Sequence, residues 1–402
     1  MIDLKLDLLQ TLTLAALVYF AGVQLRMRIA WLDRLNIPSA VIGGLLFTTL
    51  VLLLHDRLLT LELDTALQPL LSVAFFTSIG MGASLALLRA GGLQVAVFLL
   101  FATGFCLVQN LVGMGIAGAF GENPLLGVMA GSVTLVGGPA TGMAFAPVFE
   151  DAGLRGAGAL ALTAATAGIV CGGLVGGPVG TRLIQRYGLA PGAGSRAELR
   201  AELDATPDTL VVEVDREDSS LILNLVVLAL AMGLGSIVSG YIQSLGITLP
   251  AYIGAMLVAS LLRNLDDATG RLWIDQRTME FVGNLALNIF LVVALMNLKL
   301  WELAQLALPL SVILVAQVII VLAFALTVSF WLMGKDYDSA VMASGFVGFV
   351  LGTTANAVAN MRALVARFGP APRAFLVVPL VGAFFIDFTN AIIITLFVNW
   401  LK

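Results

Sequence analysis

Charged side chains are scarce in this chain of 402 residues, and their scarcity sets the first limit on what it can be. Asp, Glu, Lys and Arg make up 11% of the residues, whereas 59% are hydrophobic, and the mean hydropathy is +1.01. A soluble domain averages about 45–50% apolar and about 25% charged residues. Because a soluble core cannot absorb this excess, the sequence predicts a protein whose solvent is lipid.

Histidine and cysteine are nearly absent, and this excludes most enzyme chemistry. One His cannot supply a His-Glu-x-x-His zinc site, and no nucleophile-elbow motif precedes a usable base. The two cysteines, Cys106 and Cys171, lie in apolar stretches, where a thiol is a small packing residue. We therefore expect no enzyme, no cofactor and no transition-metal site.

A helix needs roughly 20 residues to cross a bilayer. The sequence contains ten apolar stretches that we predict to do so. The predicted spans are residues 9–25, 37–54, 67–88, 93–118, 157–181, 220–243, 248–262, 281–298, 305–333 and 374–398. Between the fifth and the sixth span, residues 188–219 are rich in Ala, Gly, Pro, Asp and Glu. This segment predicts a solvated linker between an N-terminal half, residues 1–187, and a C-terminal half, residues 220–402.

Two further apolar segments, residues 124–148 and 339–364, do not fit as full spans. Both are dense in Gly, Thr and Ser near their middle, and Gly in a helix interior costs about 1 kcal/mol relative to Ala. Irregular backbone at membrane depth is tolerated only where protein or water provides hydrogen-bond partners for its N–H and C=O groups. We predict two re-entrant hairpins; the alternative is a pair of Gly-rich spanning helices in close contact with their neighbours.

The two halves resemble each other at a constant offset. VMAGSVTLVGGPATG (128–142) and VMASGFVGFVLGTTA (341–355) start 213 residues apart, and Pro38 and Pro250 near the second and seventh spans lie 212 apart. Five spans and one hairpin per half are an odd number of crossings, so the second half must enter the membrane upside down. The predicted fold class is an all-α polytopic membrane protein of two inverted repeats, the architecture of secondary transporters.

The basic residues indicate the orientation. With the N-terminus outside, sixteen of the 21 Lys and Arg residues fall in inside loops, as the positive-inside rule requires. The sequence thus predicts two periplasmic termini and a cytoplasmic linker. The first hairpin would enter from outside and the second from inside, so that their tips meet near the midplane.

The predicted hairpins carry the groups that a transporter needs. A broken helix exposes N–H groups at its N-terminal end, which attract carboxylates, and C=O groups at its C-terminal end, which can coordinate sodium. The predicted substrate-binding residues are Gly138, Thr141, Gly142, Thr353, Thr354, Asn356 and Asp387. The predicted sodium-binding residues are Ser132, Thr134, Asn284, Asn288, Asn360 and Asn390. Close packing of the glycines, and interhelical hydrogen bonding of the amides, are the alternatives.

Asp387 is the most informative single residue, because it lies near the middle of the last predicted span. A charge at the bilayer centre costs about 2.5–3.5 kcal/mol on insertion scales, so its side chain must face the protein interior or water. It could bind a substrate ammonium or sodium, or shuttle a proton; the alternative is a structural partner for a hairpin N-terminus. An ion channel, in which carbonyl groups select the ion, is a further alternative function.

Seven stretches resemble one family, the bacterial sodium/glutamate symporters, over essentially the whole length of the chain. They are NIPS (36–39), TLVGGPATG (134–142), CGGLVGGPV (171–179), ALMNLKLWELAQLALP (294–309), MGKDYDSAVMASG (333–345), AVANM (357–361) and RFGPAPRAFLVVPLVGAFFIDFTNA (367–391). The resemblance implies an elevator-type homodimer in the lipid of the bacterial inner membrane that takes up L-glutamate with sodium as the coupling ion.

The chain departs from the family pattern at the hairpins, where Pro139, Ala140, Phe346, Ala355 and Asn356 replace other residues. Positions matching the pattern are Thr141, Gly142, Thr354, Asp387 and Asn390. A symporter of another amino acid or of a small organic anion is therefore the alternative to L-glutamate. Moving an anion inward against the membrane potential costs about 2.3 kcal/mol per charge per 100 mV, so cation coupling is expected in each case.

Overall fold

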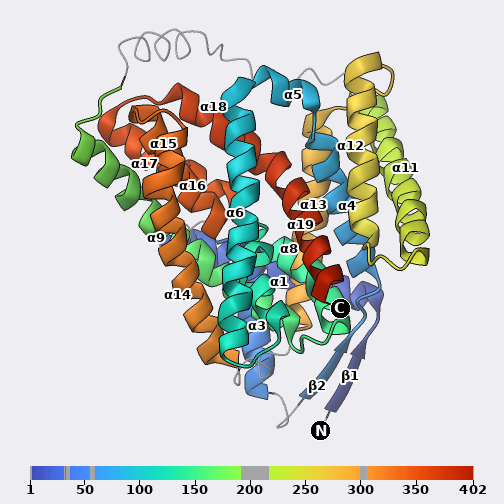
Figure 1. Cartoon of the computed structure of the whole chain (residues 1–402). Coiled ribbons are helices and arrows are strands. Elements are labelled where there is room, and N and C mark those ends of the chain that lie inside the picture. Colours follow the sequence, from blue (N-terminus) through green and yellow to red (C-terminus); the bar gives the residue numbers. More distant parts are fainter. Residues whose placement is uncertain are drawn as a thin grey trace.

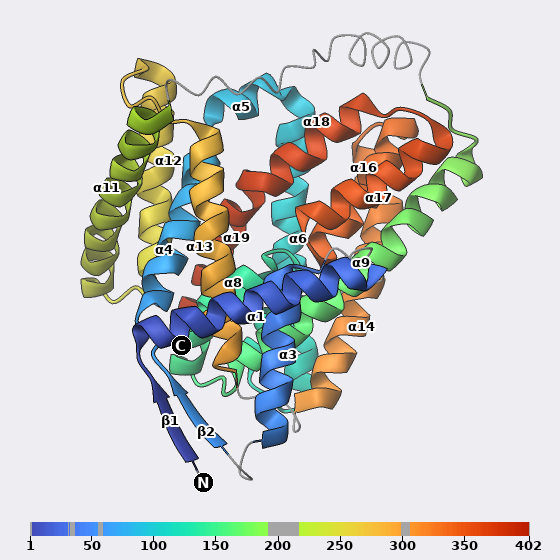
Figure 2. The same cartoon turned by 180° about the vertical axis from the view of Figure 1, so that it is seen from behind.

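A computed structural model shows an almost entirely helical chain (Figure 1) and describes residues 2–30, 32, 37–54, 59–191, 217–298 and 306–401. One group of helices packs against α4 directly or through α13, and we call it the α4 bundle. Its members are α1 (Leu8–Arg28), α3 (Ser39–Leu54), α4 (Leu67–Gly82), α11 (Glu217–Ser244), α12 (Ala251–Thr269) and α13 (Gln276–Met296). Figure 2 shows α1 crossing α13 and α3, both of which it contacts.

The remaining long helices pack around α9, and we call them the α9 bundle. From the N-terminal half come α6 (Gly92–Ala119), α7 (Pro124–Val128), the π-helical η1 (Met129–Val133), α8 (Gly138–Asp151) and α9 (Ala157–Tyr187). From the C-terminal half come α14 (Ala307–Phe324), η3 (Ala325–Ser329), α15 (Phe330–Leu332), α16 (Tyr337–Leu351), α17 (Thr354–Phe368), α18 (Pro372–Leu380), η4 (Val381–Phe385) and α19 (Ile386–Leu401). In both views α4, α11, α12 and α13 lie to one side of α9, α14, α16 and α17, while α1 and α3 extend across toward α9 and α14 (Figures 1 and 2).

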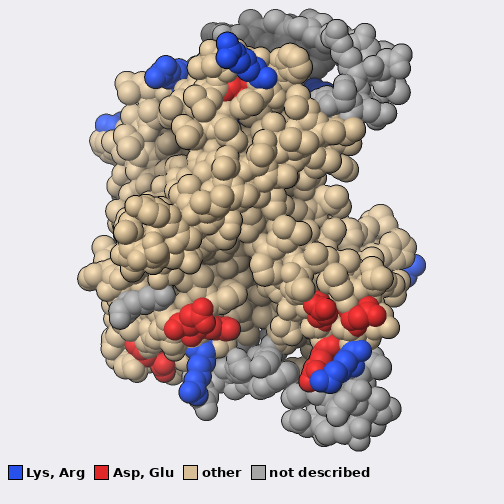
Figure 3. All heavy atoms as spheres, turned by 90° about the vertical axis from the view of Figure 1, so that its right-hand side faces the viewer, with Lys and Arg blue, Asp and Glu red and all other residues tan. Residues whose placement is uncertain are grey.

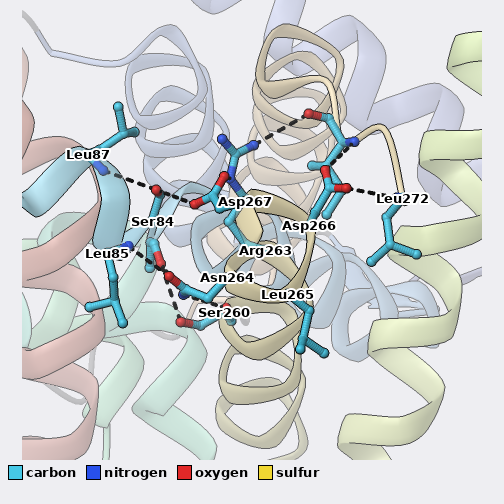
Figure 4. Close-up of polar contacts among 12 residues, drawn as sticks. Ser84, Leu85, Leu87, Ser260, Arg263, Asn264, Leu265, Asp266, Asp267 and Leu272 are labelled. Carbon is cyan, nitrogen blue, oxygen red and sulfur yellow. Dashed lines mark hydrogen bonds and ion pairs between the residues drawn. The ribbon is translucent and has the colours of Figure 1, made fainter. Parts of the chain in front are cut away.

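A short helix, α5 (Leu85–Ala90), connects α4 to α6 and is fastened to the α4 bundle (Figure 4). The Asn264 amide of α12 donates to the Ala83 carbonyl at 2.9 Å and accepts from the Leu85 N–H at 2.8 Å. The Ser84 hydroxyl, which caps α5, donates to Asp267 at 2.5 Å. The predicted span 67–88 is therefore two helices, because this cap starts a new helix after α4 ends at Gly82.

The fold class of the sequence prediction is confirmed in its coarse form, a polytopic helical membrane protein. Within the described residues, six helices have the length and apolar composition to cross a membrane: Leu8–Arg28, Gly92–Ala119, Ala157–Tyr187, Leu221–Ser244, Gln276–Met296 and Ala307–Leu332. On the face shown in Figure 3, Lys, Arg, Asp and Glu gather at the two ends, and the broad band between them carries none. Such a band is the surface that lipid requires.

One element was not expected from the sequence. Strand β1 (Ile2–Leu6) pairs in parallel with β2 (Leu59–Leu63), at the end of the molecule where both termini lie (Figure 1). Both segments alternate apolar and polar residues, which is the period of a strand. The ion pair between Lys5 and Glu62 spans the two strands at 2.7 Å.

A row of glycines on α9 explains how closely the α9 bundle packs. Gly168, Gly172, Gly176 and Gly180 are spaced four residues apart, so they form one helix face. A Cβ atom at Gly168 would overlap the Leu351 carbonyl, and one at Gly172 would lie 3.1 Å from the Leu351 side chain. Small residues let membrane helices approach each other, and here they admit α16 and α17.

This packing gives the first prediction. Replacing Gly168 by Ala should lower the free energy of unfolding by about 1–3 kcal/mol, because the backbone of α16 cannot give way to the added methyl group. Gly177→Ala is the matched control on the same helix, since a Cβ there meets nothing within 4 Å; it should stabilise α9 by about 0.5–1 kcal/mol. Thermal melts in detergent measure both. Equal melting temperatures for the two variants would contradict the packing role of the row.

Candidate functional site

The first break lies between η1 and α8, inside the segment that the sequence marks as irregular. Gly131 leaves the helical conformation, with φ −101° and ψ −129°, and Gly138 adopts φ +67°. A positive φ is readily available only to glycine, so Gly138 permits the turn into α8. The Asn110 side chain of α6 accepts the Ser132 N–H at 2.9 Å. The break is thus supported by a side chain from a neighbouring helix.

The second break, Gly352 and Thr353, separates α16 from α17. The Thr353 hydroxyl accepts the Asn356 N–H at 3.4 Å and so caps α17. The next residue, Thr354, donates its hydroxyl to the Gly382 carbonyl at 2.6 Å. Gly382 lies in η4, and a π-helical turn of this kind is frequent at functional sites. The second break is therefore tied to the span that carries Asp387.

The two breaks meet inside the α9 bundle. A Cβ atom built on Gly138 would lie 3.7 Å from the Gly352 carbonyl oxygen and 3.8 Å from the Thr353 methyl carbon. The N-terminal ends of α8 and α17 therefore face a common region. Each such end carries unpaired N–H groups and the positive pole of a helix dipole. This arrangement suits an anionic ligand, and a carboxylate in particular.

The residues predicted to bind substrate lie at or beside these breaks. Thr141 is buried, and Thr353 and Thr354 are half-buried at the start of α17. Gly142 packs against α9, where its Cβ position lies 2.9 Å from the Ala161 side chain. Asn356 is buried and donates to the Ile169 carbonyl at 2.8 Å. The interhelical hydrogen bond weighed in the sequence analysis is thus present for Asn356.

Asp387 lies in the first turn of α19, directly after η4, and is half-buried. The hydrogen bonds of the described residues include none to its carboxylate. Two residues further on, the Thr389 hydroxyl meets that of Thr103 at 2.9 Å. This contact fixes α19 against α6 and leaves the carboxylate available to a ligand.

The six residues predicted to bind sodium do not form one cluster. Ser132 and Asn390 are joined, since the Asn390 amide donates to the Ser132 carbonyl at 2.9 Å, and Thr134 belongs to the same break. Asn360 instead donates to the Gly172 carbonyl at 2.9 Å, between α17 and α9. Asn284 and Asn288 lie on α13 in the α4 bundle, where Asn284 is exposed. The Asn288 amide donates to the Asn284 carbonyl at 2.8 Å.

Comparison of the sequence with known proteins identifies its family. The family described as "Sodium/glutamate symporter" matches residues 4–370. The chain belongs to the sodium/glutamate symporter family. The sodium/glutamate symporters of Escherichia coli (strain K12) and of Shigella flexneri are each 40% identical to it over 396 residues, 98% of this chain and 97% of theirs. That of Haemophilus influenzae is 37% identical over 384 residues, 95% of each chain. These relatives are transporters, so the expectation of no enzyme is confirmed.

Three buried amides of this symporter-family chain were missed by the sequence reasoning. Gln109 and Asn110 lie side by side in α6, Gln317 lies in α14, and all three are completely buried. The signal was present, because a polar side chain within an apolar membrane helix is expensive and marks a functional position. Gln109 donates to the Val350 carbonyl at 3.1 Å, just before the second break. Asn110 accepts the Ser132 N–H in the first break.

The departures from the family pattern occupy two kinds of environment. Phe346 is completely buried among aromatic rings, with the Phe105 and Phe324 centroids at 5.4 and 5.5 Å. Ala355 is exposed at the start of α17, and Pro139 stands at the start of α8, where a missing N–H costs nothing. Phe346 therefore changes the packing behind the second break, whereas Ala355 changes the surface at its tip.

The aromatic environment of Phe346 gives the second prediction. Phe346→His would bury an imidazole among apolar rings, and an unpaired buried polar group costs about 1–3 kcal/mol. We expect a lower melting temperature than for Phe346→Leu, which loses ring contacts but adds no polar atom. A histidine variant as stable as the leucine variant would mean that a polar partner is within reach of position 346.

Proposed function

We propose that the protein is a sodium-coupled symporter of L-glutamate that works by elevator-type alternating access. The observation that carries this proposal is the contact of the two helix breaks, with Gly138 against Gly352 and Thr353. Two helix N-termini provide two sites for carboxylates, and L-glutamate carries two. Relatives that match nearly the whole chain are named sodium/glutamate symporters.

In this proposal the substrate-binding residues are those at the paired breaks, together with Asp387. The α8 and α17 ends and the hydroxyls of Thr141 and Thr353 take the carboxylates, while Thr354, whose hydroxyl donates to the Gly382 carbonyl, ties the second break to η4. The Asp387 carboxylate, which accepts no hydrogen bond from the described part of the chain, takes the substrate ammonium or a coupling ion. Another amino acid or organic anion is the alternative ligand, because Ala355 alters the exposed tip of α17.

The order of the elements supports two inverted repeats. α7 begins at Pro124 and α16 at Tyr337, the same offset of 213 residues as the sequence motifs. Each half gives its first three long helices to the α4 bundle and the rest to the α9 bundle. We propose repeats over 1–187 and 220–402, each with a re-entrant hairpin; of the linker 188–219, residues 192–216 lie outside the described residues.

The division into two bundles supports an elevator. All predicted substrate residues lie in the α9 bundle, which we propose moves, and the α4 bundle is the scaffold, through which we propose the homodimer forms. Because α5 is fastened to α12, motion between the bundles must bend the chain beyond α5, at Gly91 and Gly92. Gly92 has φ +71°, and a Cβ there would meet nothing within 4 Å.

We further propose the bacterial inner membrane as the location, with both termini periplasmic. The termini lie at the end of the molecule opposite α5 (Figure 1). The positive-inside rule assigns the α5 end, with Arg89, to the cytoplasm.

Proteoliposomes test the transport reaction directly. Under an inward sodium gradient, the protein should concentrate labelled L-glutamate inside above the external concentration, since symport couples uptake to the ion gradient. Replacing sodium by choline should abolish the accumulation. Flux that only equilibrates, with or without sodium, would support a channel instead, and accumulation of a different amino acid or organic anion would correct the substrate.

A matched glycine pair tests the paired breaks. Gly138 and Gly121 have similar positive φ, +67° and +73°, but Gly121 lies before α7 and its Cβ would meet nothing within 4 Å. Both Gly→Ala variants should lose about 1–2 kcal/mol of stability to the left-handed backbone. Only Gly138→Ala should also weaken L-glutamate binding, by about 10-fold or more, in equilibrium binding to purified protein. Equal affinities would contradict the placement of the substrate between the breaks.

A further inference from the structure

Five completely buried residues around the first break each keep one polar side-chain atom without a hydrogen-bond partner. The atoms are Gln109 Oε1, Asn110 Nδ2, Ser132 Oγ, Gln317 Oε1 and Asn390 Oδ1. Buried polar atoms are nearly always paired, so each unpaired atom requires an explanation. Here the residues are linked by hydrogen bonds and by their adjacency in α6, and four of the five atoms are oxygens, which points to one shared partner for these four.

The hydrogen bonds that these residues do make arrange them around the breaks. Gln317 donates to the Gln109 carbonyl at 2.7 Å, and Gln109 donates to Val350 at 3.1 Å. Asn390 donates to the Ser132 carbonyl at 2.9 Å. Each of the three amide nitrogens is therefore used to orient its side chain. What remains unpaired on Gln109, Gln317 and Asn390 is the amide oxygen.

The unpaired set is rich in oxygen and fits a cation. Three amide oxygens and the Ser132 hydroxyl are neutral oxygen ligands, the type that hard cations take. η1 adds the C-terminal end of a broken helix, whose carbonyls coordinate sodium in other transporters. Asp387, three residues before Asn390 on α19, supplies a negative charge nearby. Asn110 Nδ2 is a donor and does not belong to the ligand set.

We propose that Gln109, Ser132, Gln317 and Asn390 bind a sodium ion between α6, η1, α14 and α19. This inference rests on the proposed sodium coupling and names its ligands. The position explains the coupling itself. Gln109 reaches Val350 before the second break, and Ser132 belongs to the first. An ion held by both residues fixes the two breaks relative to each other, and with them the helix ends that receive the substrate carboxylates.

The test is the sodium dependence of thermal stability in detergent, without substrate, at constant ionic strength in choline chloride. A ligand that binds only the folded protein raises its melting temperature in a concentration-dependent way. Gln109→Met and Gln317→Met keep the side-chain volume and remove the oxygen. Each should raise the half-saturating sodium concentration by about 10- to 100-fold. Gln317→Glu keeps the ligand oxygen, adds a charge and replaces the Nε2 donor by an oxygen opposite the Gln109 carbonyl, so it should shift the half-saturating sodium concentration.

Asn399→Leu is the matched control, because all amide atoms of Asn399 are bonded, to Thr248 and to Thr395. It should lose stability and keep the sodium response. Methionine variants with an unchanged half-saturating concentration would overturn the site and mean that ordered water fills it. If the methionine variants cannot be purified, Gln317→Glu is the deciding variant. An unchanged sodium affinity of Gln317→Glu would also overturn the proposed site. No sodium response in the wild type would contradict the proposed function instead.

Discussion

The ends of two broken helices, buried inside a bundle that faces lipid, are the constraint on which this structure depends. Each break leaves backbone N–H and C=O groups without a helical partner where water cannot supply one. Each group that stays unpaired costs several kcal/mol. Side chains of neighbouring helices satisfy part of this demand, as Asn110 does for the N–H of Ser132. The glycine row of α9 brings α16 and α17 close enough for the breaks to meet. The polar groups that remain without a hydrogen-bond partner are available to ligands.

The same constraint divides the chain into two bundles of different character. The α9 bundle holds the breaks, Asp387 and six of the seven buried amides of the described residues; the seventh, Asn224, lies on α11. The α4 bundle contacts it through few elements, chiefly α4, α12 and α13 against α8, η4 and α19. The connector α5 is fastened to α12 by Asn264 and Asp267. The proposed elevator rests on this division into two bundles.

Apolar composition and the positions of Gly-rich segments predicted much of this fold, because the requirements of lipid and of helix geometry can be recognised in short stretches of sequence. Each predicted span contains helix, and both segments predicted as irregular break, at Gly131–Gly138 and Gly352–Thr353. The bundle membership of a polar residue could not be predicted, since it depends on which helices meet in space. The sequence analysis grouped Asn284 and Asn288 with the other predicted sodium ligands, whereas the structure places both on α13 in the α4 bundle. Gln109 and Gln317 were overlooked although their apolar surroundings marked them.

Distances between spin labels test the central claim, that the α9 bundle moves as one body against the α4 bundle. Labels replace exposed arginines, Arg362 on α17 and Arg277 on α13, in a Cys171→Ala background; a second pair, Arg362 and Arg186, lies within the α9 bundle. Pulsed electron resonance in liposomes compares each pair with and without sodium and L-glutamate. The Arg362–Arg277 distance distribution should shift, and the Arg362–Arg186 distribution should stay unchanged. A shift within the α9 bundle, with none between the bundles, would contradict the account.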